Sequence, residues 1–220
     1  MFWFLASFII WALVHSLTAA SSTKSAFRKQ FGERAYQGLY RLLYNVLSLV
    51  SFVPVLYALW TQIPQVTLWT IPYPWRYITM GIQLLALGGL TLSLWQTDVW
   101  SFAGLRQALH YLRGSAQPQL PDQLVVRGTY SWVRHPLYFF SLLFIWLNPD
   151  MTLASLLFNI LATLYFWIGS IYEERRLLRA FGPTYEAYQQ SVSRLFPRPM
   201  AIPVAIAIAI AIAIGIGIFQ

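Results

Sequence analysis

The chain has 220 residues, of which 58% are hydrophobic and 10% are charged, and its formal net charge is +8. This composition excludes an ordinary soluble globular protein. The absence of cysteine excludes disulfides, thiolate metal sites and a cysteine nucleophile. Several stretches free of Asp, Glu, Lys and Arg approach or exceed the roughly 20 residues that a spanning helix needs. The sequence therefore predicts an all-α, polytopic membrane protein with about five to six transmembrane helices.

The first three apolar stretches predict three spans, at about residues 2–20, 42–61 and 76–95. The first lacks a basic start and opens with aromatic residues, so it is interpreted as a retained span rather than a signal peptide. Between the second and third spans, prolines at positions 64, 72 and 74 predict an extended connection.

The basic residues are distributed asymmetrically about these spans. Fourteen of the 15 Lys and Arg residues fall within residues 24–41, 98–134 and 173–198, and Arg76 alone lies on the other side. By the positive-inside rule these segments face the cytoplasm. This distribution argues against a nucleic-acid partner and places the expected active site at the cytoplasmic face of what we take to be a bacterial inner membrane.

The fourth and fifth apolar runs are joined by the turn signal Asn148-Pro149-Asp150, which predicts a helical hairpin. The fourth run is short, so its helix is expected to begin near Ser131 and to carry Arg134 and His135 inside the membrane boundary. After residue 203, alternating Ala and Ile predict a sixth helix or a tail lying on lipid. The expected organisation is N-terminal transmembrane helices at 1–97, a catalytic region at 98–198 and an apolar tail at 199–220.

Polar side chains flank the hairpin on both sides, and the hairpin would bring them to one membrane face. They are Tyr130, Arg134, His135, Tyr138, Glu173 and Glu174. Charged residues beside spans usually mark a site. This set suits a ligand with a heteroaromatic ring, a ribose and a carboxylate. Two other interpretations stay open: an Arg-His pair that snorkels to headgroups, and carboxylates that begin a solvated helix, where neighbours point about 100° apart.

The spacing of these residues resembles a known family. Gly128-x-Tyr130, Arg134-His135-Pro136-x-Tyr138, Glu173-Glu174 and Arg194-x-x-Pro197 match the C-terminal pattern of integral-membrane methyltransferases, which include the isoprenylcysteine carboxyl and phospholipid methyltransferases. The resemblance implies S-adenosylmethionine as cofactor and no metal. It implies cofactor contacts from the following residues: Leu124, Val125, Tyr130, His135, Pro136, Leu137, Tyr138 and Glu173. The expected catalytic residues are Arg134, Glu174 and Arg106.

Upstream segments narrow this resemblance. Phe102-Ala103-Gly104-Leu105-Arg106-Gln107 looks like the methanethiol S-methyltransferase branch, and His15-Ser16-Leu17 is also similar to NnrU-type membrane proteins. The expected partners are a small thiol or lipid-like methyl acceptor and membrane lipids, with no obligate protein partner. The alternative is a haem-binding NnrU-like redox or isomerase protein with His15 and His135 as axial ligands. The Glu-Glu pair favours the methyltransferase.

Overall fold

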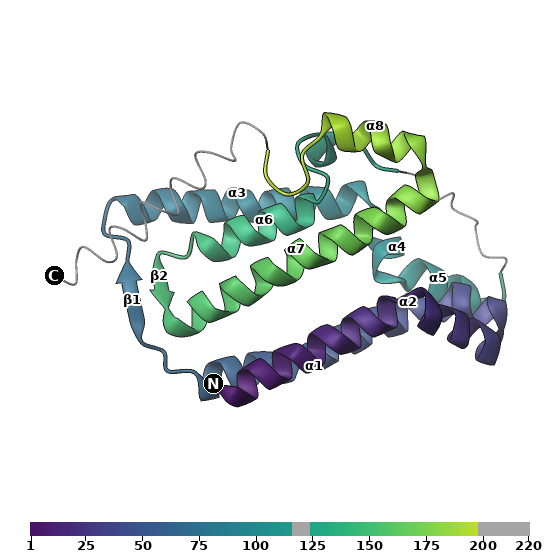
Figure 1. Cartoon of the computed structure of the whole chain (residues 1–220), viewed down its shortest axis with the longest axis horizontal. Helices are drawn as coiled ribbons and strands as arrows, with labels where there is room; N and C mark the ends of the chain where they lie inside the picture. Colours follow the sequence, from purple (N-terminus) through teal and green to yellow (C-terminus); the bar gives the residue numbers. More distant parts are fainter. Residues whose placement is uncertain (116–123, 198–220) are drawn as a thin grey trace. The chain divides into compact units, whose positions relative to one another are not determined.

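A computed structural model describes residues 1–115 and 124–197 of the chain. The described residues are mainly helical, and four of their helices are long and apolar enough to cross a membrane (Figure 1). These are α1 (Phe2–Ala19), α2 (Ser21–Gln62), α3 (Trp75–Gln96) and α7 (Leu153–Phe181). The prediction of an all-α polytopic membrane protein is confirmed. The expected helix at 200–220 lies outside the described residues.

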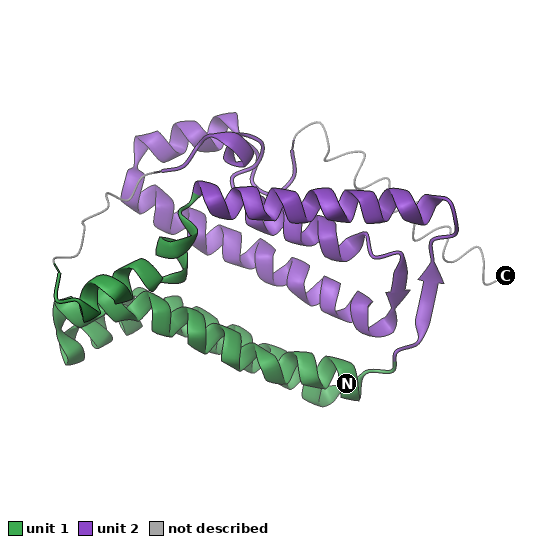
Figure 2. Cartoon of the chain, turned by 180° about the vertical axis from the view of Figure 1, so that it is seen from behind, with its two compact units in different colours: residues 1–64, 97–123 green, residues 65–96, 124–220 purple. Residues whose placement is uncertain are grey.

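The chain forms two compact units, each of which is discontinuous in sequence (Figure 2). Unit 1 contains residues 1–64 and 97–123, and unit 2 contains residues 65–96 and those from 124 onward. The third helix belongs to the second unit. The organisation expected from the sequence, with segments at 1–97, 98–198 and 199–220, stays a prediction.

Unit 1 contains a long hairpin of α1 and α2. The short helices α4 (Val99–Ala103) and α5 (Leu105–Leu112) pack against α2. Residues 24–41, the first basic segment, form the first part of α2. Gly32 interrupts that helix with a φ of +83°, a conformation that glycine adopts without a steric penalty. Beyond this kink α5 lies against α2, where a Cβ on Gly38 would stand 2.5 Å from the Cβ of Tyr111.

Unit 2 is built around the packing of α3 against the shorter helix α6 (Pro136–Trp146). Their buried core consists of four apolar residues, Ala86, Val133, Phe139 and Phe140. Gly89 makes this approach possible, since a Cβ there would collide with the ring of Phe140. Helices α6 and α7 follow each other as the expected hairpin (Figure 1).

The hairpin differs from the prediction at its start. The expected helix from Ser131 is wrong: residues Gly128–Ser131 form a separate 3-10 turn, η1, and α6 begins at Pro136. The physical reason is Pro136, which favours the first helical position and holds the residue before it in an extended conformation; the φ of His135 is −121°. With 11 residues, α6 is about 16 Å long, less than the thickness of a bilayer core. Arg134 and His135 therefore precede the apolar helix instead of lying within it.

A two-stranded ribbon lies at the end of unit 2 where α3 and α7 begin (Figure 1). Strand β1 (Thr67–Thr70) pairs antiparallel with β2 (Asp150–Thr152), and Arg76 bonds Asp150 at 2.5 Å beside it. The extended connection expected before residue 75 is thus part of a ribbon. Nothing in the local sequence identified its partner, because the two strands are about 80 positions apart.

Candidate active site at the polar end of α7

Backbone pairing holds the segment before α6 against the segment after α8 (Pro183–Ser191), the last helix among the described residues. Val133 bridges Ser193, the amide of Arg134 donates to the carbonyl of Ser193 at 2.8 Å, and the amide of His135 donates to the carbonyl of Arg194 at 3.1 Å. Two segments some 60 positions apart are thereby fixed beside each other. The arginine and histidine enter the site from a rigid backbone.

Arg134 and Glu174 form a buried ion pair at the centre of this arrangement. Nε of Arg134 donates to Oε1 of Glu174 at 2.6 Å, and the two side chains are 8% and 4% exposed. One terminal nitrogen of Arg134 also donates to the carbonyls of Gln189, at 3.0 Å, and Val192. The guanidinium therefore ties α7 to the end of α8 and holds its charge in a fixed place.

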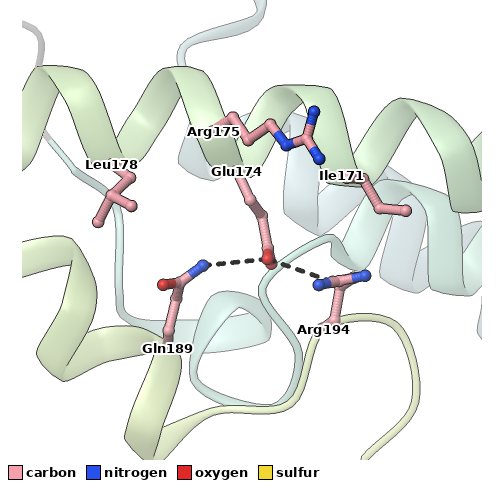
Figure 3. Close-up of a pocket in the computed structure, with 6 residues that line it drawn as sticks. All are labelled: Ile171, Glu174, Arg175, Leu178, Gln189 and Arg194. Carbon is pink, nitrogen blue, oxygen red and sulfur yellow. Dashed lines mark hydrogen bonds and ion pairs between the residues drawn. The ribbon is translucent and has the colours of Figure 1, made fainter.

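The second oxygen of Glu174 is equally committed. Oε2 accepts hydrogen bonds from Nε2 of Gln189 at 3.1 Å and from Nε of Arg194 at 3.2 Å (Figure 3). A buried carboxylate is stable when its lone pairs are satisfied by charged or polar donors. Glu174 meets this condition on both oxygens, so it is suited to hold neighbouring groups in place.

His135 lies between the two carboxylates. Its Nδ1 is 3.4 Å from Oε2 of Glu173, and its Nε2 is 3.4 Å from Oε1 of Glu174. Burial opposes the charged imidazolium, but the interactions with Glu173 and Glu174 outweigh burial and raise the pKa of His135 above 6.5. Neighbouring carboxylates on a helix point about 100° apart, so at most one of them need face a site. Here both lie within 3.4 Å of His135, because its imidazole lies between them.

Glu173 differs from its neighbour in having an accessible oxygen. Its Oε2 accepts a hydrogen bond from the hydroxyl of Tyr138 at 3.0 Å, while the side chain is 35% exposed. Among the described residues, no hydrogen bond to Oε1 is found. The ring of Tyr138 stacks between His135 and Phe166, with interplanar angles of 3° and 6°. An accessible carboxylate beside a flat, layered aromatic surface can attract a cation.

Two buried tyrosines of α8, Tyr185 and Tyr188, lie near the ion pair of Arg134 and Glu174. The hydroxyl of Tyr188 donates to the carbonyl of Tyr130 at 2.5 Å, which fixes η1 against α8. The hydroxyl of Tyr185 is buried and has no hydrogen-bond partner among residues 1–115 and 124–197. Burial and the negative charge of Glu174 raise the pKa of Tyr185, so the phenol stays protonated as a potential donor.

A pocket of about 280 Å³ opens beside Glu174 (Figure 3). Its lining residues come from α7, α8 and the segment after α8: Ile171, Glu174, Arg175, Leu178, Gln189 and Arg194. The α7 members recur at helical spacing and share one face. At 100° per residue, Glu173 points about 150° away from the centre of that face. The pocket and the accessible oxygen of Glu173 are therefore two separate features that flank one ion-pair cluster.

The remaining expected cofactor residues all lie in unit 2. Leu124 and Val125 are half-buried, Pro136 is buried at the start of α6, and Leu137 follows it. Arg106 belongs to unit 1, where it pairs with Asp98 at 3.1 Å. The cluster at Glu174 is complete without Arg106. The expected contacts of these residues with a cofactor stay predictions.

His15 also lies in unit 1, within a hydrogen-bonded cluster between α1 and α2. Its Nδ1 is 2.9 Å from Oγ of Ser48, and its Nε2 is 2.6 Å from the hydroxyl of Tyr44. An axial haem ligand at this position would have to give up one of these contacts. The geometry therefore gives His15 a role in joining α1 to α2.

Sequence reasoning did not assign roles to three residues of the cluster: Tyr185, Gln189 and Arg194. One signal was available in the spacing, since Tyr185, Tyr188 and Gln189 lie within about one helical turn and share a face of α8. The role of Arg194 as a partner of Glu174 could not be found in this way. It depends on the course of the chain after α8.

The chain is similar to several known proteins over most of its length. A methanethiol S-methyltransferase of a Pseudomonas species is 33% identical over 156 residues, which are 70% of this chain and 58% of that protein. Enzymes of the same name from Mycobacterium tuberculosis and Bradyrhizobium diazoefficiens are 31% and 29% identical and are covered to 75% and 64%. No solved structure matches the chain. The family model described as NnrU protein matches residues 3–218, and the chain belongs to this family.

Proposed function

We propose that this protein is a membrane methyltransferase that uses S-adenosylmethionine and acts on a small thiol or a lipophilic acceptor. The names of the relatives support methyl transfer, although the chain spans 58% to 75% of the lengths of the three described above. The single observation that carries the proposal is Glu173. Its side chain is partly exposed beside the layered rings of Tyr138 and His135, at the polar end of a candidate membrane span.

The residues present fit the chemistry of this donor. S-adenosylmethionine carries a sulfonium and an ammonium cation, a ribose diol and a flat adenine ring. The accessible oxygen of Glu173 would accept hydrogen bonds from the diol or the ammonium. The stacked rings of His135, Tyr138 and Phe166 hold the hydroxyl of Tyr138 against this carboxylate and so fix its position. Leu124, Val125, Tyr130 and residues 135–138 would complete the binding surface.

When bound, S-adenosylmethionine would supply a methyl group: an acceptor sulfur would bond to the methyl carbon as the bond from that carbon to the donor sulfur breaks, which leaves S-adenosylhomocysteine. A thiol acceptor reacts as the thiolate, so its proton must first be lost. Arg106, expected as a catalytic cation, would favour the thiolate. Arg134 and Glu174, expected as catalytic residues, are engaged with each other, so we assign them the positioning of His135 and α8. Accurate positioning can itself lower a methyl-transfer barrier by several kcal/mol.

The experiment that tests this function is calorimetric titration of S-adenosylhomocysteine into the purified protein in detergent micelles. We expect saturable binding. Incubation with S-adenosylmethionine carrying a labelled methyl group should then transfer the label to methanethiol or to an extracted lipid, which identifies the acceptor class. No heat of binding at millimolar ligand in several detergents would contradict the proposal.

We also propose that the site faces the cytoplasm, because 14 of the 15 basic residues lie in segments that the positive-inside rule assigns to that side. The natural absence of cysteine makes the test simple. A single cysteine at Thr70, in β1, and one at Ala187, in α8, should label with an impermeant thiol reagent from opposite sides of the membrane. Labelling of the Ala187→Cys variant from outside intact cells would reverse the orientation.

A further inference from the structure

The pocket beside Glu174 has a chemistry that the proposed methyl transfer does not use. Two arginines, Arg175 and Arg194, line it together with the apolar side chains of Ile171 and Leu178. Nε of Arg194 is engaged by Glu174, and among the described residues no hydrogen bond is found from its terminal nitrogens. The guanidinium of Arg175 has only a ring contact there, 5.6 Å above Tyr172. Several strong donors therefore remain for a ligand.

The charge of the pocket is positive. Glu174 is its one acidic lining residue, and the bond of 2.6 Å to Arg134 already compensates that carboxylate. The positive charges of Arg175 and Arg194 therefore exceed the negative charge that remains in the lining. Guanidinium groups bind phosphate oxygens through paired N–H donors. An oxyanion with several acceptor oxygens is the class of ligand that would satisfy them.

The position of the pocket on α7 indicates where such an anion would come from. Trp167, Ile171, Arg175 and Leu178 follow one another along one face of a helix long and apolar enough to span a membrane. Trp167 and Tyr172 are both exposed, and each lies against a guanidinium, that of Arg194 or of Arg175. Exposed aromatic rings beside arginine side chains are typical of the depth at which lipid headgroups begin.

We propose that this pocket binds the phosphate group of an anionic membrane phospholipid. Arg175 and Arg194 hold the phosphate, while Trp167 and Ile171 contact the glycerol and the first carbons of the acyl chains. This site lies on the face of α7 turned away from the accessible oxygen of Glu173. It is independent of the proposed methyl donor, and it anchors the polar end of α7 at the membrane surface.

The test compares the full chain in nanodiscs of phosphatidylcholine with and without phosphatidylglycerol. We expect phosphatidylglycerol to raise the thermal unfolding temperature and to remain bound to the protein in native mass spectrometry. Arg175→Gln should bind phosphatidylglycerol roughly ten-fold more weakly, the loss expected for one charge-assisted contact. Since the side chain of Arg175 is exposed and, within the part of the chain that the structure describes, has only its ring contact with Tyr172, this variant should fold.

Arg179→Gln is the matched control. It removes the same charge one turn further along α7, from a residue that does not line the pocket, and should retain lipid binding. Equal losses in the two variants would overturn the proposal in favour of general surface charge. A thermal shift produced equally by inorganic phosphate would overturn the lipid source. Displacement of the lipid by S-adenosylhomocysteine would assign the pocket to the methyl donor. Titration of that ligand in the same nanodiscs tests the methyltransferase proposal separately.

Discussion

Glu173 and Glu174 are adjacent and chemically identical, yet the structure gives them opposite surroundings. Glu174 is buried and receives hydrogen bonds from Arg134, Gln189 and Arg194. Glu173 is partly exposed; its Oε2 accepts a hydrogen bond from the hydroxyl of Tyr138 and lies 3.4 Å from Nδ1 of His135. The cause is the helix itself, which turns neighbours about 100° apart and so directs one toward α8 and the other toward the stacked rings. A pair of identical residues can therefore combine a structural role with a ligand-binding one.

The strongest test of this difference is the loss of the buried charge. Glu174→Gln leaves Arg134 buried without its counter-charge, and breaking a buried pair in this way typically costs about 3–5 kcal/mol. We expect this loss in reversible unfolding by SDS titration in mixed micelles. Glu33→Gln is the matched control, because Glu33 belongs to an exposed pair with Arg28 and should cost less than about 1 kcal/mol. Equal losses would show that burial does not distinguish the two pairs.

The second test concerns the accessible carboxylate. Glu173→Gln should keep the fold but weaken binding of both S-adenosylmethionine and its product S-adenosylhomocysteine, because the two ligands carry the same ribose diol and ammonium. The affinity for each ligand should fall roughly ten-fold, which corresponds to about 1.4 kcal/mol. Calorimetric titration measures both affinities. Glu186→Gln, which changes an exposed carboxylate of α8, should leave them unchanged. Unchanged affinity for both ligands in the Glu173 variant would remove its assigned role.

A second pair of identical neighbours, Gly88 and Gly89 in α3, extends the comparison to packing. A Cβ on Gly89 would collide with Phe140, whereas a Cβ on Gly88 would meet nothing within 4 Å. Gly89→Ala should therefore destabilise the α3–α6 contact by about 1–3 kcal/mol. Gly88→Ala should stabilise the helix by roughly 0.5–1 kcal/mol. SDS titration of the two variants measures both signs, and destabilisation of equal size in both would place α6 elsewhere.

The last test concerns the pH dependence that His135 contributes to stability. Its pKa in the folded protein is raised by Glu173 and Glu174, so its stabilising contribution is complete below pH 6.5 and is lost as pH rises through the raised value. One proton limits the slope to about 1.4 kcal/mol per pH unit. Unfolding measured from pH 5.5 to 8.5 should show this decrease, and His135→Asn should reduce it. A slope that is the same in wild type and variant would exclude His135 as its source.

The sequence was sufficient for the span positions, because they depend on local composition. Apolar stretches at about 2–20 and 76–95 coincide with α1 and α3 within one residue at each end. The polar end of α7 was also identifiable, since Arg134, His135 and Glu173 stand directly beside apolar runs. The start of α6 was placed too early because the length of a span was given more weight than the local effect of Pro136.

What the sequence alone determined is the class of the protein, an all-α membrane chain with a polar cluster at one end of its hairpin, because apolar length and charge position are properties of single segments. The tertiary structure decided which carboxylate is buried, that Arg194 and Gln189 surround it, and that β1 pairs with β2. These features depend on contacts between segments distant along the chain. No periodicity within either segment records such a contact, so the course of the folded backbone decides it.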